Sequence, residues 1–208
     1  MFIPGSFRMT EQEEITRFMQ AHPFAIIVSH SDAGLTATHT PVELESDAEG
    51  RPLIRTHIAR ANQQWKALEA GAEAMVIFQG PHTYISSSWY DHVNVPTWNY
   101  LAVHVYGKVR ILSQEEALNM LHRLVSRYEQ QPGHRFAIDQ MSPEDLLAHL
   151  QALVAFEITV DRVDAKVKLS QNRDLHNYDR IIDALAERED ADSRQIREEM
   201  LKRRDQIK

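Results

Sequence analysis

The sequence predicts a mainly β fold with helical additions, of the α+β class. Six or more strand-like segments follow one another at short spacing, and the helical segments are inserted between them rather than alternating with them. Residues 102–112 give the clearest strand pattern, because Val103, Val105 and Val109 alternate with polar side chains. Since parallel sheets need strands and helices in alternation, the 208 residues predict an antiparallel barrel or sandwich.

The first half of the chain is expected to hold one helix and then a series of strands. The helix follows the capping-box sequence Thr10-x-x-Glu13 and ends before Pro23. A short helix with Asn62 as its N-cap ends at Gly71. The expected strands cover residues 24–29, 35–45, 53–58, 74–78 and 82–86, with turns at 31–34 and 47–52.

The second half alternates long strands with capped helices. Gly107 predicts a bulge or bend inside the strand 102–112. Ser113-x-x-Glu116 opens one helix, and Ser142 followed by Pro143 opens another. A strand at 154–163 and a polar turn at 168–172 precede a helix that contains Ile181 and Ile182.

The last segment differs in composition from the rest. From Glu187 onward there are seven acidic and seven basic residues and almost no apolar face. Such a segment is typical of a solvated helix or a frayed tail. The expected organisation is therefore one domain over residues 1–187 and a charged C-terminal helical tail over residues 188–208.

Composition excludes several classes of protein. The chain has no cysteine, which excludes disulfides and cysteine-ligated metal and favours a cytoplasmic location. No apolar run approaches the roughly 18 residues of a membrane span, and the N-terminus lacks a signal-peptide pattern. The net charge of −7 argues against a strong, direct grip on nucleic acid. The eleven histidines are scattered, so no metal site is expected.

Residues 79–100 form an unusual aromatic stretch. They include two of the three tryptophans, three of the six tyrosines and a run of three serines, but few long aliphatic side chains. Aromatic faces beside hydroxyls and imidazoles suit a flat ligand with polar edges. The alternative is an aromatic loop that plugs the end of a barrel.

Residues 56–65 combine a strand end, an arginine and a helix start. Free backbone N–H groups at a helix N-terminus, together with the Arg60 guanidinium, predict an anion site that suits a phosphate. The alternative is that Arg60 is a solvated loop residue and Asn62 only a cap. Hydroxyls, imidazoles and amides at other strand ends add candidate polar groups: Thr38, His39, Ser86, Ser87 and residues 168–172, with Trp89 or Trp98 as an apolar wall.

Six blocks of the sequence are distinctive: MFIP (1–4), ATHTP (37–41), NQQW (62–65), FQGPHTYISSSWY (78–90), VPTWNY (95–100) and KLSQN (168–172). Together they resemble the PaiB-like family of FMN-binding negative transcriptional regulators. The resemblance runs from residue 1 to about residue 187. It implies a split β-barrel of antiparallel, Greek-key strands, related to pyridoxamine-phosphate oxidase, in a homodimer that binds FMN between its subunits.

The resemblance also implies positions for the cofactor. It places the phosphate at residues 56–62, where this chain departs from the TNxxSRK pattern of the oxidases: His57 replaces Asn, and no lysine follows Arg60. The family favours proline where this chain has Gln63. The expected cofactor-binding residues are Thr38, His39, Thr56, His57, Arg60, Asn62, Ser86, Ser87, Trp89, Trp98, Asn99 and Lys168. Of these, Trp98 and Asn99 are expected to come from the partner subunit.

Three functions remain open on the sequence. The first is an FMN-binding homodimeric regulator, which would act on transcription directly or through a partner. The second is an NAD(P)H-dependent flavin reductase or FMN-dependent oxidoreductase, in which the flavin supplies the redox chemistry. The third is a haem-binding split-barrel protein. No catalytic residue is assigned by any of the motifs.

Overall fold

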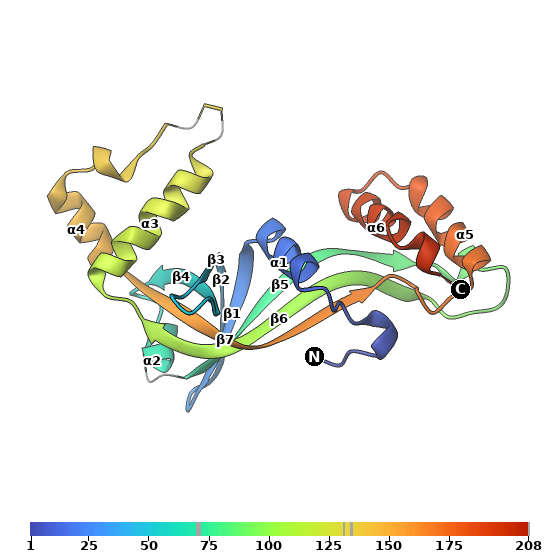
Figure 1. Ribbon diagram of the computed structural model, residues 1–208, viewed down its shortest axis with the longest axis horizontal. Helices are drawn as coiled ribbons and strands as arrows, with labels where there is room; N and C mark the ends of the chain where they lie inside the picture. Colours follow the sequence, from blue (N-terminus) through green and yellow to red (C-terminus); the bar gives the residue numbers. More distant parts are fainter. Residues whose placement is uncertain (70–71, 131, 134, 208) are drawn as a thin grey trace. The chain divides into compact units, whose positions relative to one another are not determined.

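The computed structural model describes residues 1–69, 72–130, 132–133 and 135–207. Its centre is one seven-stranded antiparallel sheet with the strand order β2-β1-β5-β6-β7-β4-β3 (Figure 1). The strands are β1 (Phe24–Ser31), β2 (Gly34–Pro41), β3 (Glu43–Ser46), β4 (Pro52–Ala59), β5 (Glu73–Ile85), β6 (Thr97–Ile111) and β7 (Leu153–Lys168). The expected mainly β fold with inserted helices is confirmed.

The chain divides into two compact units. Unit 1 comprises Met1–Phe18, Gln79–His104 and Asp164–Lys208, and unit 2 comprises Met19–Phe78 and Val105–Val163. Strands β5, β6 and β7 each contribute residues to both units. Unit 2 contains the whole of strands β1 to β4.

In unit 2, strand pairing follows the sequence pattern closely. Strands β1 and β2 form a hairpin from Phe24↔Pro41 to Ser31↔Gly34, with the expected turn between them. Strand β4 pairs with β7 from Leu53↔Thr159 to Ala59↔Leu153. One face of β4 is buried, because the side chains of Ile54, Thr56 and Ile58 all point into the core.

The glycine at position 107, where a bulge or bend was expected, has a steric explanation. A Cβ atom at this position would lie 2.0 Å from the backbone oxygen of Thr159 on β7. Strands β6 and β7 therefore approach each other too closely for any residue except glycine. Around Gly107 the burial of Val103, Val105 and Val109 confirms the predicted alternation.

Two helices of unit 2, α3 (Gln114–Tyr128) and α4 (Pro143–Gln151), stand side by side on one face of the sheet (Figure 1). Both predicted caps are present: Ser113 and Glu116 form a complete capping box, and the Ser142 hydroxyl accepts from the amide of Asp145. The helices pack on β7 through a small apolar cluster, which consists of Leu112, Ala117, Met120, Leu150 and Ala155. A 3-10 turn, η3 (Ile138–Gln140), lies in the connection between them.

Other elements near the N-terminus differ slightly from expectation. Helix α1 (Gln12–Ala21) ends before Pro23 as predicted, but the Thr10 hydroxyl donates to the Glu11 carboxylate. Helix α2 (Gln64–Glu69) follows Asn62. The expected helix end at Gly71 lies outside the described residues. A 3-10 turn, η1 (Gly5–Phe7), replaces a fully extended N-terminal segment.

Two strand boundaries, in β5 and β6, were predicted wrongly. Residues 74–78 and 82–85 belong to one strand, β5, which continues through Gly80 and Pro81, and Ser86 lies outside it. Strand β1 pairs with β5 only up to Ile77, so Pro81 lies where no β1 partner needs its missing N–H. Strand β6 begins at Thr97, so Trp98 belongs to the strand and not to the loop before it.

The charged segment after residue 187 is helical as expected, but one face of residues 191–201 is buried, so it is neither fully solvated nor frayed there. Helix α6 (Ala191–Leu201) packs against α5 (Leu175–Ala186), and Ile196 and Met200 are fully buried. The buried Tyr178 hydroxyl of α5 donates to the Met200 carbonyl at 3.0 Å. A few small and apolar residues on one side were enough to bury this face of the helix, although its composition is mostly charged. A 3-10 turn, η4 (Arg204–Gln206), follows it.

No helix in the described ranges is long and apolar enough to cross a membrane.

Candidate functional site

In unit 2 a polar network fixes the turn between β4 and α2. The Thr38 hydroxyl donates to Gln64 Oε1 at 2.6 Å and accepts from Asn62 Nδ2 at 2.8 Å. Asn62 Oδ1 accepts from the Gln64 amide at 3.1 Å, so Asn62 caps the start of α2 as predicted. Buried Gln64 donates through Nε2 to the Ile27 and Thr36 carbonyls, each at 3.1 Å. The turn is therefore tied to both strands of the β1–β2 hairpin.

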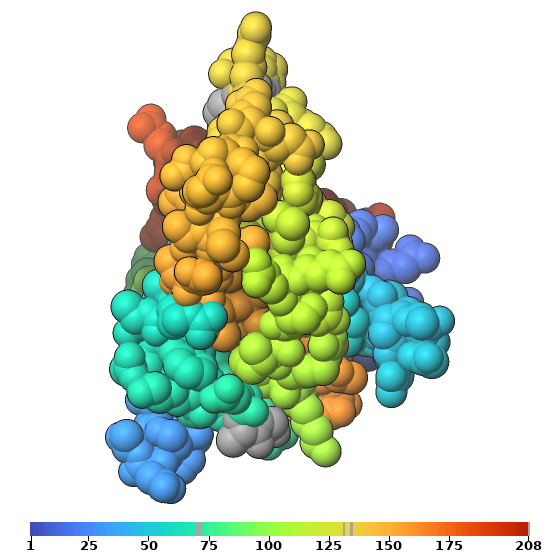
Figure 2. All heavy atoms as spheres, turned by 90° about the vertical axis from the view of Figure 1, so that its left-hand side faces the viewer, coloured from blue at the N-terminus to red at the C-terminus, as the bar shows by residue number. Residues whose placement is uncertain are grey.

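Arg60 is held in place by backbone carbonyls. Its Nε donates to the Gln151 carbonyl at 2.7 Å, and its Nη2 donates to the Leu153 carbonyl at 2.9 Å. Trp65 donates through Nε1 to the Arg60 carbonyl at 2.9 Å, and its ring centroid lies 5.8 Å from the guanidinium carbon. In Figure 2 the surface around α2 lies directly beside that of α4 and the start of β7.

The β4–α2 turn has hydrogen-bond donors that are available to a ligand. Within the described part of the chain, the backbone amides of Ala61 and Gln63 and the Nη1 group of Arg60 donate to no other group, and no carboxylate pairs with Arg60. One exposed cation and two nearby amides match the acceptors of a phosphate. Helix α2 has only six residues, so its dipole contributes little. The donor set fits an anion and depends mainly on Arg60.

Thr56 and Thr40 face the interior. Their hydroxyls lie 3.0 Å apart, and each also donates to a carbonyl, Thr56 to Pro41 at 2.7 Å and Thr40 to His57 at 2.8 Å. These bonds join β2 to β4. The Thr56 hydroxyl is buried and fully occupied, so its contribution to the site is structural.

The two histidines of the expected site have different surroundings. His39 is exposed on β2 and stacks on Phe24, with ring centroids 6.1 Å apart. His57 is largely covered, and its Nδ1 is buried without a hydrogen-bond partner. Burial lowers the pKa of His57 below its usual value, so this imidazole is neutral at neutral pH.

The other six expected residues lie in unit 1. Ser86 caps a 3-10 turn, η2 (Ser87–Trp89), by accepting from the Ser88 amide at 3.2 Å. The Trp89 ring lies under the Arg188 guanidinium at 4.9 Å from its centroid. Trp98 is half exposed and forms an aromatic cluster with Tyr84 and His82, both at 6.0 Å between centroids.

Asn99 and Lys168 are more enclosed. Asn99 is fully buried: its Oδ1 accepts from Ser170 at 2.9 Å and its Nδ2 points to the Met200 sulfur. Its side chain therefore stabilises unit 1 and is not open to a ligand. Lys168 Nζ donates to the Thr97 hydroxyl and to the Trp98 carbonyl. Burial, and then the neighbouring Lys166 and Arg173, lower the pKa of Lys168.

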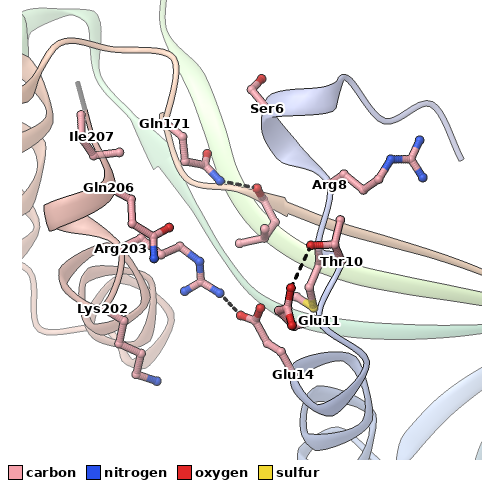
Figure 3. A pocket seen from close by; sticks show the side chains of 12 residues that line it. Ser6, Arg8, Thr10, Glu11, Glu14, Gln171, Lys202, Arg203, Gln206 and Ile207 are labelled. Carbon is pink, nitrogen blue, oxygen red and sulfur yellow. Dashed lines mark hydrogen bonds and ion pairs between the residues drawn. The ribbon is translucent and has the colours of Figure 1, made fainter.

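A pocket of about 580 Å³ in unit 1 is lined by none of these residues. It is bounded by the N-terminal segment and the end of the chain (Figure 3). Its walls carry charges of both signs, and the Glu14–Arg203 ion pair joins them. Because Glu11 and Glu14 line the walls beside the cations, and Arg203 is already paired with Glu14, the pocket is a poor phosphate site. No group of three or more potential ligands in the described residues is arranged to hold a metal ion.

Comparison with known proteins identifies the family. Residues 1–162 match the family model described as "Putative FMN-binding domain". The chain is 39% identical over 200 residues, 96% of each protein, to the protease synthase and sporulation protein PAI 2 of Bacillus subtilis. The chain belongs to the PaiB-like FMN-binding family. An uncharacterised yeast protein, YKL070W of Saccharomyces cerevisiae, is 35% identical over 106 residues, 48% of this chain and 63% of the yeast protein.

Solved structures confirm the split-barrel fold of this PaiB-like protein. The FAD and heme binding protein of Mycobacterium smegmatis aligns with a TM-score of 0.59 at 17% identity, over 77% of this chain and 73% of that one. The flavocytochrome Anf3 of Azotobacter vinelandii aligns with a TM-score of 0.60 at 18% identity, over 78% and 69%.

The family carries an FMN-binding domain, and the donors of unit 2 fit its phosphate. The structure brings three expected residues together around the β4–α2 turn: Thr38, Arg60 and Asn62. Thr56 faces the interior, His39 stacks on Phe24, and His57 points to the other face of β4 from Thr56. Sequence reasoning missed Gln64 and Trp65, which position Asn62 and Arg60. Both belong to the NQQW block, so the block itself was the signal. Lys168 lies beyond residues 1–162 of the family match.

Proposed function

We propose that this PaiB-like protein binds FMN as a cytoplasmic homodimer and acts as a negative regulator of transcription. The observation that carries the cofactor part is the β4–α2 turn, which presents Arg60 and two backbone amides without an internal anion. The family membership supports FMN as the ligand. The flavin ring would supply any redox chemistry, and the protein would bind and orient it.

Within unit 2, Arg60, Asn62 and the amides of Ala61 and Gln63 hold the phosphate. Asn62 acts mainly by shaping the turn, because both ends of its amide already bond inside the protein. Thr38, on strand β2, forms the polar edge of the same site through its contacts with Asn62 and Gln64, while His39 beside it projects from the other face of the strand.

Within unit 1, Ser86, Ser87, Trp89 and Trp98 belong to the ligand groove of the dimer, with Lys168 behind Trp98. The dimer is supported by apolar side chains that unit 1 exposes close together in sequence. Val93 is fully exposed, Val95 is 68% exposed and Trp98 is 52% exposed. Apolar side chains exposed in one short segment are typical of interaction surfaces.

The phosphate assignment is tested by comparing FMN with riboflavin, which lacks the phosphate. Replacing Arg60 by alanine removes a charge-assisted contact, so FMN affinity falls by about 10- to 100-fold. Riboflavin affinity stays nearly constant, because its binding does not use the guanidinium. Fluorescence titration of both flavins gives the two dissociation constants.

The matched control is Arg17→Ala, which removes another exposed arginine, paired only with Glu13 on α1. It leaves both affinities unchanged. Equal losses of FMN and riboflavin in Arg60→Ala would show that Arg60 acts on the fold and not on the phosphate. An unchanged FMN affinity would move the phosphate site elsewhere.

Regulation is proposed to operate through a partner or a flavin-dependent activity instead of a direct grip on DNA. The net charge of −7 opposes binding to a phosphate backbone. A gel shift at low salt with promoter DNA should therefore show no complex. A complex whose affinity falls steeply with salt would establish direct binding and overturn this part of the proposal.

Haem binding is the second candidate. Two proteins of the same fold support it, a FAD and heme binding protein and a flavocytochrome. The exposed imidazole of His39 would be available to hold the haem iron. The appearance of a Soret band on adding haem, with no binding of FMN, would favour this candidate.

A further inference from the structure

Two buried polar atoms on one face of unit 2 are without hydrogen-bond partners. Across the described ranges, the buried side-chain atoms that lack a partner are Glu43 Oε2, His57 Nδ1 and the Tyr90 hydroxyl. Tyr90 belongs to unit 1, but Glu43 and His57 lie on adjacent strands of unit 2. Buried polar groups are nearly always satisfied, so two such atoms on paired strands require an explanation.

Strand register places Glu43 and His57 on the same face. Glu43 on β3 is directly opposite Arg55 on β4. His57 follows Arg55 by two residues, so its side chain points to the same side of the sheet. Such a diagonal pair has Cα atoms about 7–8 Å apart, which long side chains can span. The carboxylate and the imidazole therefore face a common space.

Helix α3 and the α4–β7 connection cover this space. His57 is opposite Ala155 on β7, and Ala155 packs against Met120 and Leu150 of α3 and α4. Arg123 of α3 reaches Glu45 at 2.6 Å but stays 3.9 Å from Glu43 Oε2. Only 8% of Glu43 is exposed. Glu43 is therefore a covered carboxyl whose nearest paired cation, Arg123, is 3.9 Å away, with Arg55 and Arg127 also near it.

The cations near Glu43 already serve other groups. Arg55 pairs with both Glu45 and Glu157, and Arg123 pairs with Glu45. Arg127 donates to the Gln20 carbonyl. The charged and titratable groups that pack around the space are Glu45 of β3, Arg55 of β4, Glu157 of β7, Arg110 of β6, Glu116, Arg123 and Arg127 of α3, and His22 before β1. Among the described residues, the shortest ion-pair distance at Glu43 is 3.9 Å, to Arg123.

We propose that Glu43 and His57 form a buried acid–base pair that holds one proton beneath α3, bridged by a single water molecule. The protonated carboxyl donates through the water to His57 Nδ1, and His57 keeps its own proton on Nε2. One water satisfies both buried atoms at once. Protonation also avoids the cost of burying a charged carboxylate, so the pair stabilises the packing of α3 on the sheet.

The pH dependence follows from the direction of each shift. Burial raises the pKa of Glu43 above its usual value, so its contribution to stability is present at low pH and is lost as the pH rises through the raised pKa. Burial lowers the pKa of His57, so its contribution is present above its usual value of 6.5 and is lost as the pH falls through the lowered pKa. Between the two losses the pair holds one proton.

The test is Glu43→Gln, which mimics the protonated carboxyl at every pH. The variant melts about 3 °C above the unmodified protein at pH 8 and at the same temperature at pH 4.5. The control is Glu115→Gln, on the exposed side of α3, which shows no pH-dependent gain. A Glu43→Gln variant that is less stable at pH 8 would show that Glu43 works as an anion, which contradicts the proposal.

Nitrogen NMR of His57 gives a second, independent readout. The proposal requires a neutral imidazole with its proton on Nε2 at pH 7. A proton on Nδ1, or a charged ring at pH 7, would overturn it. This measurement does not depend on FMN, so its failure leaves the cofactor proposal untouched.

Discussion

At the scale of single residues, Gln64 organises the candidate cofactor site without being exposed in it. Its side-chain amide bonds to the backbone of both strands of the β1–β2 hairpin, and its carbonyl oxygen accepts from Thr38. The sequence identified Asn62 as a cap, because an Asn before a helix has a known local role. It did not distinguish Gln64 from Gln63, because both are polar residues at a helix start and only the tertiary fold buries one of them.

This difference between neighbouring glutamines is testable. Gln64→Leu leaves buried carbonyl and hydroxyl groups without partners, at a cost of about 2–3 kcal/mol. We expect a melting temperature lower by about 4–9 °C. Gln63→Leu changes an exposed side chain that bonds only to the Ala61 carbonyl, so its melting temperature stays within about 1–2 °C. Equal effects in thermal melts would contradict the assigned role of Gln64.

At the scale of elements, the sequence predicted the helix starts that depend on capping residues. The Ser113 and Ser142 caps fixed the starts of α3 and α4, because a cap needs only residues within one turn. Strand β5 was predicted as two strands, because Gly80 and Pro81 usually interrupt a strand. Whether a strand can continue through these residues depends on which strand pairs with it at that point. Helix α6 was missed as a packed element because its burial depends on α5.

The close contact of β6 and β7 at Gly107 gives an element-scale prediction. Gly107→Ala would place a methyl group against the Thr159 backbone, which cannot move without breaking the pairing of β7 with β4. We expect a loss of at least about 3 kcal/mol in the free energy of unfolding. Gly5→Ala, where nothing lies within 4 Å, serves as the control and stays near neutral in denaturant titrations. A near-neutral Gly107→Ala would contradict the close approach of the two strands.

At the scale of the whole molecule, family and fold were recognisable from sequence, but the arrangement of the site was only partly so. Motif blocks that are long and rich in aromatic residues identified the family, and the strand pattern identified the β architecture. The motif blocks alone did not show which of their residues contact a ligand and which are buried and stabilise the fold. Asn99 and Thr56 were both expected to bind the cofactor, yet both are buried and bonded inside the protein.

The proposed dimer gives a prediction at this scale. Val95→Asp places a charge in the exposed apolar segment of unit 1, so association weakens by at least about tenfold, because desolvating an unpaired charge opposes it. Leu35→Asp adds the same charge to another exposed apolar position, in the β1–β2 hairpin, and leaves the dimer intact. Sedimentation equilibrium measures both. A monomeric unmodified protein at micromolar concentration would refute the dimer itself.

The central claim is that the chain binds FMN through its phosphate. The most direct measurement is the absorbance spectrum of the purified protein during titration with FMN, followed by removal of unbound ligand. We predict that flavin bands stay with the protein at a ratio approaching one FMN per chain, and that inorganic phosphate competes weakly with FMN. A protein that retains no flavin, or that shows a Soret band and takes up haem in preference to FMN, would contradict the claim.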